Sequence, residues 1–231
     1  MIKVNLGCGP VGKDDWTNVD WGMLAFLHCV PCVEKILLKL NLFPKGYNMK
    51  WPKNLKLHNC RRKLPFKDGS VDYVYTSHFL EHFKKFEAER IIRDCRRILK
   101  KGGLIRIAVP DLEILARKYT EKDAAYFKKI YALMNFGREY EGKGDFLLAD
   151  IFMDNFYPAF YKLEPAGINK LLSRFVRPHF WMYDYDSLVS LLAVSGFRNI
   201  QRKNFRQGDV PDAAELDVFG EMSLYVEAEC F

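Results

Sequence analysis

A glycine turn between two short apolar runs opens the chain and restricts its fold. Residues 3–6 (KVNL) have a strand pattern and lead directly into the turn GCG at 7–9. A second strand is predicted at 17–19, and Asp20 follows it. Glycine lets a backbone approach a ligand closely, and an acid at the next strand end can accept hydrogen bonds from ribose hydroxyls. The arrangement predicts a nucleoside-binding site in an α/β fold.

The same turn matches the dinucleotide-binding string G-x-G-x-x-G over residues 7–12. In that fold the acid comes about 20 residues later, whereas Asp20 follows Gly9 by eleven residues. Pro10 also removes a backbone N–H that a pyrophosphate would use. A nicotinamide-dependent oxidoreductase therefore stays an alternative only.

Strand and helix patterns alternate along the chain, which implies a mostly parallel sheet with helices on both faces. The glycine pair at 102–103 predicts a helix stop and a turn. Asp184 or Asp186 is the expected cap of a helix that ends at Gly196. We expect the last two strands to be joined by a helix-free loop and to pair antiparallel. The predicted strands are 3–6, 17–19, 55–58, 71–76, 104–109, 199–205 and 224–229, and the predicted helices are 85–99, 112–119 and 186–195.

Two segments exceed this core, so we predict one domain over residues 1–231 with two mainly helical insertions. Segment 22–54 has the pattern of two short amphipathic helices, interpreted as a lid, and its interspersed lysines leave peripheral membrane contact as an alternative. Segment 120–178 contains a helical stretch at 123–136 and overlaps an aromatic-rich region at 146–180. We interpret it as a substrate-side cap, because binding specificity tends to lie in such additions.

Three later motifs agree with the opening turn. They are NCRRKLPFKDGSVDYV at 59–74, YTSHFLEH at 75–82, and a stretch at 95–113 that contains CRRILKKGG and VPDLE. Together the motifs resemble class I S-adenosylmethionine-dependent methyltransferases of the type 11 kind. The resemblance implies a Rossmann-like class I fold: a seven-stranded, mostly parallel sheet with an antiparallel C-terminal strand. It also implies S-adenosyl-L-methionine as cofactor and S-adenosyl-L-homocysteine as product.

A subset of bacterial and archaeal methyltransferases is similar in further motifs, HFWMYD at 179–184 and EMSLYVEA at 221–228. Members of this subset are associated with cell-envelope polysaccharide synthesis. The association suggests a small-molecule, saccharide or lipid-linked acceptor, methylated at oxygen.

The resemblance implies a set of cofactor contacts. The glycine turn seats the methionine part, Asp20 holds the ribose, and Trp21 covers an adenine face. Asn59 stands where the family commonly has an aspartate, and its amide oxygen can still accept a hydrogen bond from the adenine amino group. The predicted cofactor-binding residues are Asn5, Gly7, Cys8, Gly9, Asp20, Trp21, Asn59, Cys60, Ser77 and His78.

Methyl transfer from a sulfonium is an in-line displacement that requires donor and acceptor to be held about 3–3.5 Å apart. A hydroxyl acceptor must also lose a proton, and a histidine suits that task. His78 is the first candidate for the base, with Asp111 and His179 second. For Asp111 a helix N-cap is an equal alternative, and His78 and His82 can instead only cap or pack.

Residues 78–82 (HFLEH) also match the zinc-protease string H-x-x-E-H, whose histidines share a helix face. Here the motif follows a strand in a nucleotide-binding layout. Cys29 and Cys32 with His58 and Cys60 form a second conceivable zinc set, and the C-x-x-C alone a redox pair. Apolar cysteines in an amphipathic helix are usually core residues. We therefore predict no metal site.

The net charge of +7 favours anionic partners: nucleic acid, a membrane surface or a phosphorylated substrate. The basic residues are spread along the chain without an RNA-binding motif, and the Asn/Asp-Pro-Pro-Tyr motif is absent. An RNA methyltransferase and a non-catalytic cofactor-binding partner protein are the alternatives.

The six cysteines do not form a disulfide framework in a chain of this length, which predicts reduced thiols and a cytoplasmic protein. We expect no signal peptide, because a strand begins at once. The sequence has no run of about 18 uncharged apolar residues, so we predict no transmembrane helix.

Overall fold

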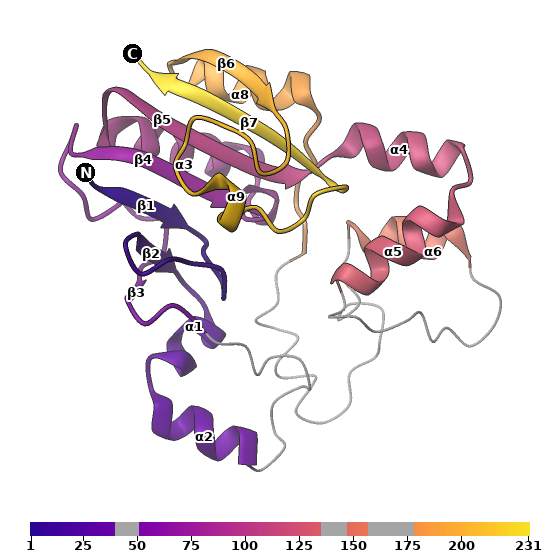
Figure 1. Ribbon diagram of the computed structural model, residues 1–231, viewed down its shortest axis with the longest axis horizontal. Coiled ribbons are helices and arrows are strands. Elements are labelled where there is room, and N and C mark those ends of the chain that lie inside the picture. Colours follow the sequence, from indigo (N-terminus) through magenta and orange to yellow (C-terminus); the bar gives the residue numbers. More distant parts are fainter. Residues whose placement is uncertain (40–50, 135–146, 157–177) are drawn as a thin grey trace.

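The computed structural model describes residues 1–39, 51–134, 147–156 and 178–231. Within these ranges the strands form one seven-stranded sheet in the order β3-β2-β1-β4-β5-β7-β6 (Figure 1). The strands are β1 (Lys3–Leu6), β2 (Thr17–Asp20), β3 (Leu55–Leu57), β4 (Val71–Ser77), β5 (Leu99–Pro110), β6 (Phe197–Lys203) and β7 (Ser223–Cys230).

The parallel strands β1 and β4 place the loops that follow them side by side. β1 pairs in parallel with both β2 and β4, so the loops after β1 and after β4 leave the same edge of the sheet. Only β7 runs antiparallel among the paired strands described, and it lies between β5 and β6. In open α/β sheets ligands bind outside the carboxyl ends of the strands where the order reverses, which here is the edge shared by β1 and β4.

Helices cover both faces of the sheet. The helical elements are α1 (Met23–His28), α2 (Pro31–Lys39), η1 (Leu80–His82), α3 (Lys85–Ile98), α4 (Leu112–Thr120), α5 (Ala124–Met134), α6 (Leu148–Asp154), α8 (Tyr185–Val194) and α9 (Ala213–Leu216). On one face, apolar residues of α3 and α8 pack against the sheet in the main core, among them Ile91, Ile92 and Leu192. On the other face, Trp16 and Tyr75 pack with Leu216 of α9.

Helix α4 continues from β5 into the second insertion, away from the sheet (Figure 1). A separate apolar cluster holds this part together: Leu115, Phe127, Ile130 and Ile151 are buried with Met222. Met222 immediately precedes β7, so the cluster anchors the insertion to the sheet. Within the described ranges, every helix is too short or too polar to cross a lipid bilayer.

The predicted sheet is confirmed, including the antiparallel pairing at its C-terminal end. Asp184 is the cap of α8, because its side chain accepts a hydrogen bond from the Ser187 N–H. Gly196 follows this helix with a φ of +87°, as expected for a helix end.

Two expectations were wrong. Helix α3 already ends at Ile98, and the glycine pair at 102–103 lies inside β5 rather than at the helix end. Gly102 has a φ of +78° near a register shift against β4, so the pair kinks the strand. The connection between β6 and β7 contains α9 and is not helix-free.

The two insertions contain the helices α1 and α2, and α5 and α6. Helix α2 begins at Pro31, which fits the preference of proline for the first helical turn. The expected helical residues 135–136 and most of the aromatic-rich region lie outside the described residues.

Candidate active site

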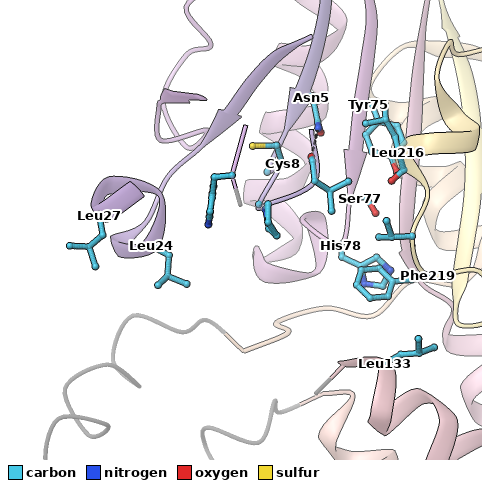
Figure 2. A pocket seen from close by; sticks show the side chains of 16 residues that line it. Asn5, Cys8, Leu24, Leu27, Tyr75, Ser77, His78, Leu133, Leu216 and Phe219 are labelled. Atoms are coloured by element: carbon cyan, nitrogen blue, oxygen red, sulfur yellow. Dashed lines mark hydrogen bonds between the residues drawn. The ribbon is translucent and has the colours of Figure 1, made fainter. Parts of the chain in front are cut away.

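A pocket of about 460 Å³ lies at the edge shared by β1 and β4 (Figure 2). The glycine turn forms its base, and Ser77 and His78 at the end of β4 border it. Figure 2 shows Leu24 and Leu27 of α1 on one side and Phe219 next to His78 on the other. The remaining lining residues are mostly apolar and are Pro10, Val11, Trp51, Tyr75, Leu133, Leu216 and Val218, with Asn5 beneath the turn.

The turn after β1 is built from backbone hydrogen bonds and two left-handed glycines. The N–H groups of Gly7 and Cys8 donate to the carbonyl of Val19, at 2.8 and 3.2 Å. Gly7 and Gly9 have φ of +65° and +50°. Asn5 is buried beneath the turn and donates to the carbonyl of Val11 at 2.9 Å. Asn5 therefore shapes the turn from below.

Asp20 lies at the end of β2 beside this turn. One of its carboxylate oxygens accepts from the Gly9 N–H at 2.7 Å, and the other from the Trp21 N–H at 2.6 Å. Burial raises the pKa of Asp20, while these two hydrogen bonds lower it. Each carboxylate oxygen has two acceptor positions, so both still have one for a ribose hydroxyl. The Trp21 side chain is 57% exposed, which leaves an indole face for an adenine.

Cys8 and Cys60 are buried next to Asp20. Burial raises the pKa of both thiols, and the charge of Asp20 raises them further. Both are therefore neutral, small apolar residues rather than nucleophiles. The Asn59 side-chain oxygen accepts from the Arg61 N–H at 3.1 Å, which fixes the amide in an Asx turn. Of the predicted cofactor residues, Asp20, Trp21, Asn59 and Cys60 are not part of the pocket wall.

His78 is the predicted catalytic residue that the structure places in the pocket. Its Nε2 lies 2.7 Å from the Ser223 hydroxyl, and its ring packs on Phe219 with centroids 4.4 Å apart. Its backbone has a left-handed φ of +48°, a strained conformation that tends to occur at functional positions. Burial lowers the pKa of His78 to about 3, and His179 and His82 contribute, so the ring is neutral at neutral pH.

The other two candidates for a base lie outside the pocket wall. Asp111 is buried and caps α4: one oxygen accepts from the N–H groups of Glu113 and Ile114, and the other from Arg202 at 2.7 Å. Its carboxylate thus forms the helix N-cap that was the equal alternative for this residue, and it also pairs with Arg202. His179 packs on His82, with ring centroids 4.9 Å apart.

Several residues of the site were not predicted. Ser223 is 145 residues from His78 in sequence, and Phe219 is almost as far. Ser223 belongs to the motif at 221–228, but nothing in that motif or around Phe219 indicates a contact with His78, which forms only when β7 pairs with β5.

A family model described as a methyltransferase domain matches residues 44–107, which include β3, β4, α3 and most of β5. The matched region contains the β4 end that borders the pocket, and the sheet has the seven strands, mostly parallel with an antiparallel C-terminal strand, that the resemblance implied. Residues 44–107 therefore match a methyltransferase domain, which implies S-adenosylmethionine as the cofactor.

Solved structures are similar to this chain at low identity. A SAM-dependent methyltransferase from Thermotoga maritima is 16% identical, with 100% of this chain and 82% of that chain covered and a TM-score of 0.47. One from Methanosarcina mazei is 16% identical over 98% and 91%, also at 0.47. One from Archaeoglobus fulgidus is 15% identical over 98% and 85%, again at 0.47. A search of curated proteins finds no match to the methyltransferase.

Proposed function

We propose that the methyltransferase methylates a hydroxyl oxygen of an acceptor that also has an apolar part, such as a lipid-linked saccharide. The observation that carries the proposal is the composition of the pocket wall. The wall contains Leu24, Leu27, Leu133, Val218 and Phe219, and its few polar side chains include Ser77 and His78. Outside the wall, the Ser223 hydroxyl lies 2.7 Å from His78 Nε2. An apolar wall with few polar groups suits an amphipathic ligand better than a polyanion.

In the proposed reaction the acceptor oxygen attacks the methyl carbon of the sulfonium. The new O–C bond forms as the C–S bond breaks, and the electron pair stays on sulfur to give S-adenosylhomocysteine. The hydroxyl proton passes to the His78 imidazole, which Ser223 and Phe219 hold in place. Proximity and alignment supply most of the acceleration, and Asp20 and the glycine turn fix the donor.

The two insertions are part of the proposal as the acceptor-binding elements. α1 contributes Leu24 and Leu27 to the pocket wall, and α5 contributes Leu133. We propose that the first insertion is a lid and the second a substrate-side cap. Both would contact the apolar part of the acceptor.

The test begins with calorimetric titration of S-adenosylmethionine. Asp20→Ala is expected to weaken binding about 10–100-fold, which corresponds to the loss of about 1.5–3 kcal/mol of charge-assisted hydrogen bonding. Asp186→Ala, at an exposed residue of α8 that does not line the pocket, is the control and should bind as the wild type does. Equal affinity in Asp20→Ala would contradict the proposed ribose contact.

The second part measures transfer of a labelled methyl group to hydroxyl acceptors with and without a lipid chain, and to RNA. We expect turnover on the amphipathic acceptors and a loss of about 10²–10⁴-fold in kcat for His78→Ala at saturating S-adenosylmethionine. Turnover on RNA alone, with a steep dependence on salt, would favour the nucleic-acid alternative. Cofactor binding without turnover on any acceptor would favour a non-catalytic partner protein.

A further inference from the structure

A cluster of two imidazoles and one carboxylate lies behind His78, just outside the pocket wall. Glu81, His82 and His179 each place one ligand atom within 4.8 Å of the others. Among the described residues no other group of three His, Cys, Asp or Glu side chains is this compact. The cysteine set considered from the sequence is therefore not brought together, and the H-x-x-E-H pair is not on a helix, since His78 has a left-handed backbone.

The backbone brings these side chains together. Glu81 and His82 belong to the short turn η1 that follows β4. The Glu81 carbonyl accepts from the N–H groups of Phe180 and Trp181, at 2.7 and 3.3 Å. These bonds tie η1 to the segment before α8 and set His179 against His82.

The carboxylate of Glu81 lacks the partners that a buried acid needs. Its side chain is 0% exposed, and neither oxygen has a hydrogen-bond partner. His78 Nδ1 lies 3.5 Å from one of these oxygens. The nearby Tyr183 hydroxyl is also buried and unpartnered. Buried acids are usually paired or bound to a metal, and a cation would satisfy this one.

Both histidines are oriented as metal ligands are. The Nδ1 of His82 faces the Pro178 carbonyl at 3.4 Å, and the Nδ1 of His179 faces the Asn155 carbonyl. A carbonyl only accepts hydrogen bonds, so each Nδ1 carries the proton and each Nε2 has a free lone pair. Metal-bound histidines usually donate their second N–H to a carbonyl or a carboxylate in this way.

We propose that Glu81, His82 and His179 form a binding site for a divalent transition-metal ion of the zinc kind. Two imidazoles and a carboxylate are a common ligand set for such ions. Two ligands at about 2.1 Å from an ion are at most about 4.2 Å apart, so small side-chain rotations complete the site. This replaces the expectation of no metal site.

The proposed ion would lie next to the pocket, where it could take part in the reaction. Three protein ligands leave coordination positions for an oxygen atom, and His78, which contacts Glu81, borders the pocket. A metal that bound the acceptor hydroxyl would lower the pKa of that hydroxyl. This role rests on the proposed function, whereas binding of the ion does not.

The experiment uses the full chain after metal removal with a chelator. Zn²⁺ is titrated by calorimetry, and Co²⁺ by its visible absorption bands, with Mg²⁺ as a contrast. We expect one Zn²⁺ per chain, and more than about tenfold weaker binding in His82→Ala, His179→Ala and Glu81→Gln. The double variant Cys29→Ser/Cys32→Ser and the variant His28→Ala are expected to bind as the wild type does.

Thermal unfolding of each metal-free variant shows whether it is folded, and Zn²⁺ should raise the Tm of the wild type but not that of the ligand variants. The proposal is overturned if the wild type binds no Zn²⁺, if Mg²⁺ binds equally well, or if folded ligand variants bind as the wild type does. Loss of binding in the cysteine variant would also overturn it. S-adenosylmethionine titration of the metal-free protein separates these results from failure of the proposed methyl transfer.

Discussion

Gly7 and Gly9 have similar backbone angles but different surroundings. Both lie in the left-handed region, where a Cβ atom is unfavourable. At Gly7 an added Cβ would lie 2.1 Å from the Phe79 ring, whereas at Gly9 nothing lies within 4 Å. Phe79 belongs to the loop after β4, so Gly7 is the point at which two pocket-forming loops touch.

This difference predicts unequal costs for two identical substitutions. Gly9→Ala should lower the free energy of unfolding by about 1–2 kcal/mol, the cost of the left-handed backbone. Gly7→Ala should lower it by about 1–3 kcal/mol more, because Phe79 must move, and should also weaken cofactor binding. Urea unfolding and calorimetry measure both effects. Equal losses in the two variants would show that the Phe79 contact is unimportant.

At the residue scale, the sequence predicted what local chemistry determines. The glycine turn and Asp20 form their contacts within about fifteen residues, so their pattern is visible in the sequence. His78 was predicted from its motif, but Ser223, Phe219 and His179 reach its neighbourhood through strand pairing and loop packing. The unpartnered carboxylate of Glu81 could not be predicted for the same reason, since its burial depends on the segment before α8.

At the scale of elements, Arg106 of β5 joins the sheet to the β6–β7 connection. Its guanidinium is fully buried and contacts Asp217 at 2.5 Å and Glu227 at 2.9 Å. Asp217 also accepts from the Tyr75 hydroxyl at 3.1 Å. Leu216, next to Asp217, lines the pocket. The arginine therefore positions one pocket wall from beneath.

Removing Arg106 should leave two buried carboxylates without their partner. We expect Arg106→Met to lower the free energy of unfolding by about 3–5 kcal/mol. Arg106→Lys keeps the charge but has a single donor group in place of the planar fork, so its loss should be smaller yet clear. Denaturant unfolding tests both variants. If Arg106→Met leaves the free energy of unfolding unchanged, the ion cluster stabilises the fold no more than apolar packing does.

The order of elements was predictable because caps and apolar periods are local, as at Asp184. The kink at 102–103 was not predictable. A glycine pair after a helix predicts a turn, and the residue at which the next strand begins depends on its pairing with β4. α9 has only four residues, too few for a helical period, and its position depends on Asp217 and its buried partner.

For the whole molecule, Asp212 connects the first residues of the chain to the last third. It accepts hydrogen bonds from Lys3 at 2.9 Å, Trp16 at 2.8 Å and Lys13 at 2.9 Å. These donors hold the pKa of Asp212 well below its ordinary 3.8, with Lys3 as the largest cause and Trp16 next. The ionised carboxylate thus stabilises the folded state.

The low pKa of Asp212 predicts a pH dependence. Its contribution is fully present above the unfolded pKa of about 4 and is lost as pH falls towards the folded value. Asp212 has a left-handed φ of +63°, which asparagine tolerates. Asp212→Asn should therefore lower the free energy of unfolding by about 1–3 kcal/mol at pH 7. The difference in the free energy of unfolding between the wild type and Asp212→Asn should become smaller as the pH falls from 4 to about 2.

Urea unfolding across that range, with Glu221→Gln as the control, provides the measurement. Glu221 pairs with Lys129 at the surface, where such pairs contribute about 0–1 kcal/mol. If the loss of unfolding free energy in Asp212→Asn is the same at every pH, it does not come from the charge of Asp212.

The late position of β7 in the chain has a consequence for synthesis. β7 is the last strand described, yet it fits between β5 and β6. While the polypeptide emerges from the ribosome, the edge of β5 is unpaired until β7 has been made, and β6 has no neighbour in the sheet. Unpaired edges invite association with other chains, so a translational pause before residue 223 would leave an aggregation-prone nascent protein.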